Sequence, residues 1–228
     1  MRARINLYET WNFDSVNYYF NQVIGKEYTP AFAYSDYGWF LMLEDKYEEG
    51  MLNIGKAAKM TASNKQLSTQ LKAWYAWALC WEGDYQEAKH WITKALKINP
   101  NDAEALHVAS RIASGMGDHE EAIKLAEKAA KDPRWRVAVP LALFKAGHEQ
   151  KAEEWVVEIA ADETVFDAML LVEVYSELKN DQKALEYLQK SFDLRHPFMP
   201  WLKVIPGMEH LHDDPRFKTI VEKMNLPK

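Results

Sequence analysis

The chain has 228 residues, 48% hydrophobic and 27% charged, as in folded soluble domains. Its net charge of −6 lacks the basic footprint of a nucleic-acid-binding protein, so we expect no nucleic-acid partner. The single cysteine, Cys80, excludes an intrachain disulfide and fits a reducing, cytoplasmic location. Residues 73–81, the longest aliphatic and aromatic run, are too short to cross a bilayer, and the first residues lack a signal-peptide core. No membrane partner is therefore expected.

Helical periodicity runs through nearly the whole chain. Residues 137–144 are apolar enough for a strand, but they lie where the first helix of a pair is expected, and Pro140 should bend or delay that helix. Residues 61–64 are expected to form a loop. The predicted helices, in chain order, are 2–11, 12–26, 30–43, 47–60, 65–81, 85–98, 102–115, 118–131, a pair within 133–160, 164–179 and 181–195.

The segment from Gly83 to Asp102 has the clearest local signals. Asp84 can cap a helix, and Glu87, three residues later, can close a capping box. Small and apolar side chains then recur at helical spacing on one narrow face, at Ala88, Ile92 and Ala95. A proline at position 100 ends the helix, because the residue before a proline is pushed out of the α region.

The same segment recurs along the chain. Gly117 opens a matching stretch 34 residues after Gly83, and Ala122 follows Ala88 by 34. The equivalent positions are Val16, Gly50, Ala88, Ala122, Ala152 and Ala184, with steps of 34, 38, 34, 30 and 32. A period scattered about 34 resembles the tetratricopeptide repeat. The resemblance implies an all-α, right-handed superhelical solenoid of antiparallel helix pairs.

The resemblance divides the single solenoid into repeats. The expected units are a partial first repeat at 1–30, repeats at 31–64, 65–100, 101–132, 133–163 and 164–196, and a C-terminal cap at 197–228. Because the first helix is short, the array begins in mid-repeat. Two explanations remain open: a portion of a longer signalling protein, or a complete small protein with an abbreviated cap.

The last residues, 195–228, carry a second resemblance. They resemble the tail of bacterial tetratricopeptide arrays in signalling proteins and transcriptional regulators, through the motifs at 201–204 and 214–217 and through Met224. Asp214 can cap a helix that Pro215 begins. The helix then presents one apolar stripe, made by Phe217, Ile220, Val221 and Met224. Such a helix would cover the open end of the array.

Aromatic residues mark the candidate groove. By resemblance to the family, Trp77 and Trp81 take first-helix positions that line the concave side, and Trp39 takes the equivalent position one repeat earlier. A helical wheel places Trp74, Trp77 and Trp81 within about 60° of one another. Two alternatives stay open: these rings form a binding wall, or they pack on one another in a tightly curled superhelix.

Later repeats place polar residues in the same positions. These are His107 and Arg111, then Arg134 and Lys145, then Glu173 and Glu177. The groove would thus pass from aromatic to basic to acidic, and its basic middle would suit an acidic group of a partner.

The expected function is a scaffold that binds a protein or peptide in the concave groove. The alternative is a ligand-sensing or autoinhibitory module of a bacterial signal-transduction or transcriptional regulatory protein. No catalytic, cofactor or metal site is expected, and the chain is not expected to be an enzyme. His210, His212, Asp213 and Asp214 could be drawn as a metal cluster, but a solvated loop before a capped helix is the favoured interpretation.

Overall fold

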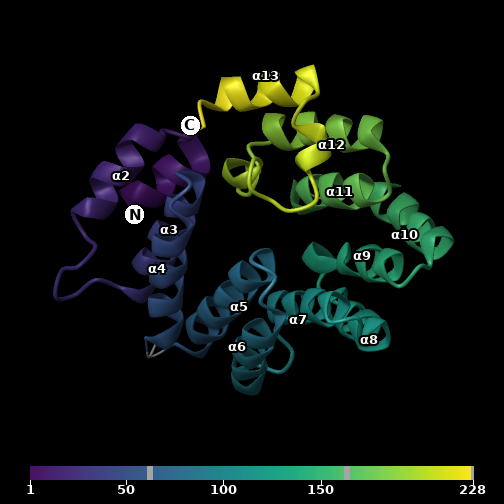
Figure 1. The fold of residues 1–228 in the computed structure, drawn as a ribbon, viewed down its shortest axis with the longest axis horizontal. Coiled ribbons are helices and arrows are strands. Elements are labelled where there is room, and N and C mark those ends of the chain that lie inside the picture. Colours follow the sequence, from purple (N-terminus) through teal and green to yellow (C-terminus); the bar gives the residue numbers. More distant parts are fainter. Residues whose placement is uncertain (61–63, 162–164, 227–228) are drawn as a thin grey trace.

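The computed structural model describes residues 1–60, 64–161 and 165–226, with backbone only at 165–167. Helices joined by turns make up this described part, which contains no strand (Figure 1). None of the helices within it is long and apolar enough to cross a membrane. The predicted all-α class is therefore confirmed.

The helices follow one another as antiparallel neighbours, and consecutive pairs pack most closely. Their bounds are α1 Arg2–Arg4, the π-helix η1 Ile5–Thr10, α2 Phe13–Asn21, α3 Ala31–Leu43, α4 Tyr47–Lys59, α5 Lys65–Trp81, α6 Tyr85–Ile98, α7 Ala103–Gly115, α8 His119–Ala129, η2 Pro133–Trp135, α9 Ala138–Lys145, α10 Glu149–Ala161, α11 Val165–Glu177, α12 Asp181–Asp193, η3 Met199–Trp201, η4 Glu209–Leu211 and α13 Pro215–Met224.

The predicted turn chemistry sets the second helices of the middle pairs. The Asp84 side chain accepts a hydrogen bond from the Glu87 backbone N–H at 3.1 Å, so α6 begins where the sequence predicts. Gly83 before it has φ of 77°, a left-handed conformation that glycine adopts at no steric cost. The equivalent Asp118 caps α8 in the same way. The observed bounds of α5 and α6 equal the predicted 65–81 and 85–98.

Small residues sit where the helices of a pair touch. Ala88, Ala122, Ala152 and Ala184 have no solvent exposure, as their recurrence predicts. In the α3–α4 pair the contact is closer still. A Cβ built on Gly38 would lie 2.6 Å from the carbonyl oxygen of Gly50, far inside van der Waals contact. A Cβ on Gly50, in the alanine position of its repeat, would lie 2.8 Å from the Gly38 carbonyl oxygen, so alanine there would prevent this backbone approach.

Three predicted segments differ in detail. The helix expected at 2–11 is a short α1 followed by the π-helix η1, which ends at Trp11 in the left-handed region. The helix expected to reach residue 26 stops at Asn21. The first helix of the 133–160 pair is delayed by the 3-10 turn η2, so that Pro140 falls in the first turn of α9, where no intrahelical N–H bond is lost. Residues 61–63 of the predicted loop lie outside the described part.

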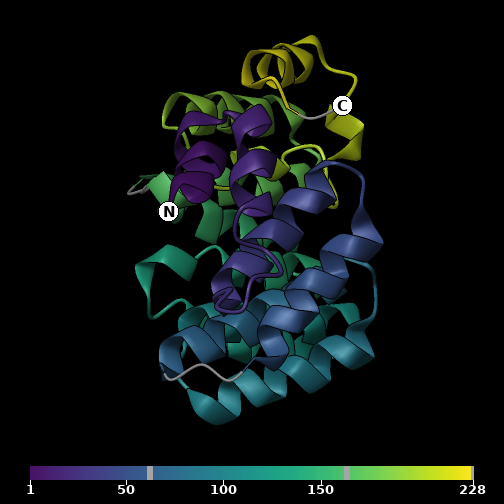
Figure 2. The same cartoon turned by 90° about the vertical axis from the view of Figure 1, so that its left-hand side faces the viewer.

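The array curls until its two ends meet. Figures 1 and 2 show the N-terminal helices beside the C-terminal segments. The ring centroids of Trp11 and Phe192 are 5.5 Å apart, and those of Tyr8 and Trp201 are also 5.5 Å apart. The Arg195 guanidinium donates a hydrogen bond to the Glu9 carbonyl oxygen at 3.2 Å. These contacts close the helices into a ring, and we call them the seam.

The final helix, α13, packs against α12 on the outside of the ring (Figure 1). Phe217, Ile220 and Met224 on its inner face are buried, as their spacing predicts. Asp214 caps the helix by accepting from the Arg216 backbone N–H at 2.8 Å. The apolar stripe of α13 therefore covers the outer helix of the last pair.

Candidate functional site

A cavity of about 1010 Å³ lies inside the ring. Side chains of α3, α5, α7 and α11 line it, together with the N-terminal helices and residues 195–208. In the pairs α3–α4, α5–α6, α7–α8 and α11–α12, the first helix is thus the one that faces inward. The cavity is the concave side of the solenoid, closed by the seam.

The predicted tryptophans divide between cavity wall and core. Trp74, Trp77 and Trp81 of α5 are half-buried and line the cavity. Trp39 also reaches the lining, but only 8% of it is exposed. Its ring makes edge-to-face contacts with Trp81 at 5.1 Å and with Trp201 at 6.1 Å. The binding-wall alternative therefore describes the half-buried tryptophans of α5, and the packed-core alternative describes Trp39.

The C-terminal tail forms one side of the cavity. The Trp201 indole N–H donates to the Trp39 carbonyl oxygen at 3.1 Å, in a buried position. Phe198 stands edge-on to Trp77 with centroids 5.7 Å apart. Residues 195–208 thus contribute to the concave surface, a role that the sequence did not reveal. The available signal was the apolar, proline-flanked stretch at 197–202, which is too large and hydrophobic for a solvated linker.

The basic residues predicted for the middle of the groove already have acidic partners. Arg111 lies 2.5 Å from a carboxylate oxygen of Glu173, and both line the cavity. The Arg134 guanidinium holds Asp132 through two bonds, Nε to Oδ1 at 3.1 Å and Nη2 to Oδ2 at 2.6 Å. The sequence predicts a basic stretch here that would suit an acidic group of a partner. Because α11 and the Asp132 turn supply countercharges, these arginines offer little net attraction to an acidic group.

The remaining predicted groove residues are not among those that line the cavity. His107 is buried and stacks on Trp135 with centroids 4.8 Å apart. Burial, aided by the charge of Arg111, lowers the pKa of His107 well below its usual value, so this imidazole is neutral. The Lys145 ammonium and the Glu177 carboxylate form an ion pair at 2.7 Å. His107, Lys145 and Glu177 therefore lie outside the lining, although the His107 ring contacts Trp77 with centroids 5.8 Å apart.

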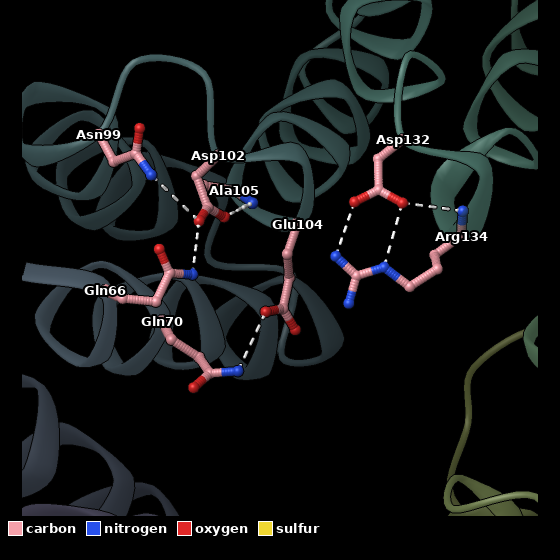
Figure 3. A network of polar contacts seen from close by, with 8 residues as sticks. All are labelled: Gln66, Gln70, Asn99, Asp102, Glu104, Ala105, Asp132 and Arg134. Atoms are coloured by element: carbon pink, nitrogen blue, oxygen red, sulfur yellow. Dashed lines mark hydrogen bonds and ion pairs between the residues drawn. The ribbon is translucent and has the colours of Figure 1, made fainter.

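Two carboxylates at the start of α7 face the cavity, and the sequence analysis missed both. Glu104 accepts from the Trp74 indole N–H at 2.7 Å. It also accepts from the Gln70 amide at 3.3 Å, as Figure 3 shows. Asp102 caps α7 through the Ala105 backbone N–H at 3.0 Å, and it also accepts from the Gln66 amide at 2.9 Å. In sequence, these acids look like ordinary first-turn residues of a helix. Only the packing of α5 against α7 shows that they point inward.

Burial governs the electrostatics of Glu104. Desolvation raises the pKa of its carboxyl, although the bonds from Trp74 and Gln70 act in the opposite direction, and the neighbouring charge of Asp102 raises it further. No ion pair within the described residues involves Glu104: its partners are an indole and an amide, both neutral. The Arg134 charge lowers this pKa at a distance, without an ion pair. Glu104 is therefore a half-buried carboxyl group that faces the cavity with no cation in direct contact.

The N-terminal helices are held to α3 by another buried carboxyl. Arg4 lies 3.1 Å from Asp36, and the Tyr8 hydroxyl donates to the other Asp36 oxygen at 3.1 Å. Burial raises the pKa of Asp36 to about 6, against the opposing effects of Arg4 and Tyr8. Arg4 and Tyr8 also line the cavity, so this cluster positions one of its walls.

The weak chemical motifs of the sequence have structural roles. His210 pairs with Asp181 at 3.2 Å, and the His212 ring packs on Phe217 at 4.7 Å. No group of three or more His, Cys, Asp or Glu side chains in the described ranges could hold a metal ion. Burial raises the pKa of the Cys80 thiol to about 12, more than Arg111 lowers it, so the thiolate is strongly disfavoured.

Two comparisons with solved structures concern the overall arrangement. The human IFIT1 dimer with m7Gppp-AAAA aligns over 93% of this chain and 53% of its own, at 15% identity and a TM-score of 0.42. A monomeric mutant of IFIT1 with Gppp-AAAA aligns over 93% of this chain and 55% of its own, at 16% identity and a TM-score of 0.43. The chain spans about half the length of these structures. No curated protein matches it.

The family comparison concerns the middle of the array. Residues 81–139 match the family model described as the tetratricopeptide repeat. This segment contains α6, α7 and α8, in which the capped turns and the buried alanines recur. This stretch of the chain is therefore similar to the tetratricopeptide repeat, and paired helices continue on both sides of it.

Proposed function

We propose that the protein binds a short segment of a partner protein in the central cavity. The observation that carries this proposal is the cavity itself, about 1010 Å³ in volume and walled by the inner helices of the array. Binding pockets for small ligands span about 300–1,000 Å³, so this space suits a few side chains of a peptide rather than a folded domain. The inner helices of tetratricopeptide arrays supply shape and specificity in this way.

The aromatic lining supports an anchored mode of binding. Trp74, Trp77 and Trp81 keep part of their surface open toward the cavity while their neighbours hold them. Tryptophan is favoured at binding hot spots because it buries a large area at little cost in side-chain entropy. Arg111 and Glu173 add a polar stripe that can orient the segment.

One observation favours a second candidate, a ligand-sensing module. Phe198 and Trp201 of the C-terminal tail lie against Trp77 and Trp39, on the same concave surface that a partner would use. A ligand that displaced these rings would move the tail. Occupancy of the cavity would then be coupled to the position of residues 195–208.

Selection of peptides against the full chain tests the binding proposal. A random peptide library is selected on the wild-type protein, and the winners are measured against Ala103→Trp, which fills the cavity at a lining position. Ala161→Trp, the same change at an exposed position of α10, is the matched control. We expect affinity to fall about tenfold or more in Ala103→Trp, a loss of about 1.4 kcal/mol, and to stay unchanged in the control. Peptides that bind all three proteins equally would place the binding surface outside the cavity.

A further inference from the structure

We infer that the ligand of the cavity presents a positively charged nitrogen, an ammonium or guanidinium group, which docks against Glu104 between aromatic walls. This inference rests on the proposed function and deepens it, because it assigns the chemical class that the cavity recognises. It also reverses the sequence-based expectation of an acidic partner group.

Most of the arginines that line the cavity are already paired with carboxylates. Arg111 is paired with Glu173, and Arg134 with Asp132. Arg4 is paired with Asp36 in the same way. Three of the four arginines on the lining therefore have a carboxylate partner, and Arg195 is the fourth.

The exception, Arg195, has its own partners at the seam. It donates to the Glu9 carbonyl oxygen and lies over the Trp11 ring, with the guanidinium carbon 4.8 Å from the centroid. None of these four arginines makes a described ion pair with Glu104. Among the carboxyl groups that line the cavity, Glu104 is thus one that no arginine contacts directly.

The nearest rival for Glu104 is Arg134, which Figure 3 shows on the far side of the Glu104 carboxylate from Gln70. Arg134 is held by a bidentate pair with Asp132, whose carboxylate also accepts the Arg134 backbone N–H at 3.0 Å. Three bonds to one carboxylate fix this geometry locally. Arg134 therefore acts on Glu104 only through its charge, which lowers the pKa of that carboxyl, and leaves the Glu104 oxygens open to a ligand.

Glu104 is also partly desolvated. A buried carboxylate with only neutral donors is unfavourable, and a cation placed beside it recovers much of the lost solvation. Burial raises the pKa of Glu104 because the charged carboxylate loses solvation there, and a cation beside it would favour the charged form again. Asp102, two residues earlier and also on the lining, adds to the negative potential.

Aromatic side chains also line the cavity. Trp74 donates directly to Glu104, and Trp77 and Trp135 line the same cavity with centroids 6.4 Å apart. The faces of indole rings attract ammonium and guanidinium groups, by about 0.5–2 kcal/mol, and they attract anions poorly. Trp74 itself meets Glu104 through the edge of its ring, so the attraction would come from indole faces elsewhere on the lining, and it favours a cation over a neutral or an acidic group.

A purely structural role for Glu104 is the competing interpretation. Its bonds to Trp74 and Gln70 tie α7 to α5, as a packing contact would. The substitution Glu104→Gln separates the two, because the amide oxygen still accepts from Trp74 while the negative charge is removed. The new NH2 group can in turn donate to the Gln70 amide oxygen once that amide turns over, so both contacts to α5 can persist. Cation recognition, by contrast, requires the charge.

The test uses small probes on the full chain, followed by calorimetry. Benzylammonium and benzylguanidinium are compared with benzyl alcohol and benzoate, which share the ring but are neutral or negative. We expect either cation to bind about tenfold tighter than benzyl alcohol, and benzoate to bind most weakly. Glu104→Gln should lower the affinity of the cation about tenfold and leave that of benzyl alcohol unchanged, with the melting temperature as a check on folding. The two cations distinguish ammonium from guanidinium recognition.

Glu127→Gln, an exposed carboxyl of α8 away from the cavity lining, is the matched control and should change nothing. Benzoate binding as tight as that of the cations, unchanged cation affinity in Glu104→Gln, or no binding of either cation at 10 mM, about the weakest measurable range, would overturn the inference. Selected peptides that depend on the cavity but lack Lys and Arg would also overturn it while leaving the proposed function intact. Cation binding through Glu104 with no cavity-dependent peptide would overturn the proposed function alone.

Discussion

The middle of the array and the seam hold the ring together by different means. In α5 to α8, regular helices meet through small residues, and Ala88 and Ala122 have no exposure. At the seam, the π-helix η1 and the residue after it meet the 3-10 turn η3 and the end of α12 through large rings, with Tyr8 against Trp201 and Trp11 against Phe192. The repeats depend on contacts between neighbouring helices that recur at a regular spacing in the sequence. The seam depends on contacts between large side chains that each occur only once.

This difference also predicts which part of the molecule unfolds locally first. The seam joins residues more than 160 positions apart, as in the Trp201–Trp39 hydrogen bond. Contacts between distant residues must offset the entropy of closing a long loop, whereas each repeat needs only its neighbours. Local opening is therefore expected at the seam before it reaches the middle of the array.

The largest effect should come from breaking the seam with Trp201→Ala. Trp201 is buried, its N–H donates to the Trp39 carbonyl oxygen, and its ring contacts Tyr8 and Trp39. Losing a core tryptophan costs about 3–5 kcal/mol. We expect this loss to appear in hydrogen exchange as reduced protection of α1, α2 and residues 195–205, with α7 and α8 nearly unchanged.

Trp155→Ala, on the half-buried surface of α10, serves as the comparison for aromatic loss outside the seam. It should leave the exchange of α1 and α2 as in the wild type. Uniform loss of protection along the whole chain in Trp201→Ala would show that the seam and the repeats unfold as one unit, and the contrast drawn above would be wrong.

A smaller effect should follow from the carboxyl of Asp36, which is buried beside the seam and holds the N-terminal helices to α3. Burial raises the folded-state pKa of Asp36 to about 6, above the usual value of 3.8. Because the folded protein holds the proton more tightly, this group stabilises the fold fully below pH 4, and the stabilisation is lost as the pH rises through 6. A shift of about two pKa units corresponds to about 2–3 kcal/mol.

The measurement is the free energy of unfolding of the wild type minus that of Asp36→Asn, taken by urea titration from pH 4 to pH 7. We expect the difference to fall by about 2–3 kcal/mol over that window. Asp14→Asn, on the exposed face of α2, controls for the general effect of removing a carboxyl and should give a flat difference. A flat profile for Asp36→Asn would mean that Arg4 and Tyr8 compensate its burial fully.

The sequence was informative where structure depends on neighbours. The capped turn at Asp84, the buried alanines and the bounds of α5 and α6 are all local consequences of spacing. The inward position of the α5 tryptophans follows from the same register. What could not be predicted was set by segments distant in sequence. Nothing near Arg111 in sequence indicates Glu173 as its partner, and nothing near Glu104 reveals that Trp74 would donate to it.

The curvature of the helix array could not be predicted from the sequence. The period of the repeat indicates helix pairs, but the angle between successive pairs depends on side-chain volume at each contact. The missing Cβ atoms of Gly38 and Gly50 let α3 and α4 approach unusually closely, for example. Such small changes accumulate around the ring until Trp201 reaches Trp39. The tail then becomes a wall of the site, in addition to carrying the α13 cover.

The smallest effect should come from the repeat side of the comparison, with Ala122→Leu. Ala122 is fully buried between α7 and α8, and its carbonyl oxygen accepts from the Ser110 hydroxyl at 2.8 Å. A larger side chain must push the two helices apart, at a cost of about 1–3 kcal/mol. Glu127→Leu, the same new side chain at an exposed position of α8, should stay within about 0.5 kcal/mol of the wild type. Because each repeat contacts only its neighbours, the added strain should stay near α7 and α8, and hydrogen exchange at the seam should not change. Equal stability of the two variants would show that the contact at Ala122 has room to spare, and a loosened seam would show that strain in one repeat is transmitted around the ring.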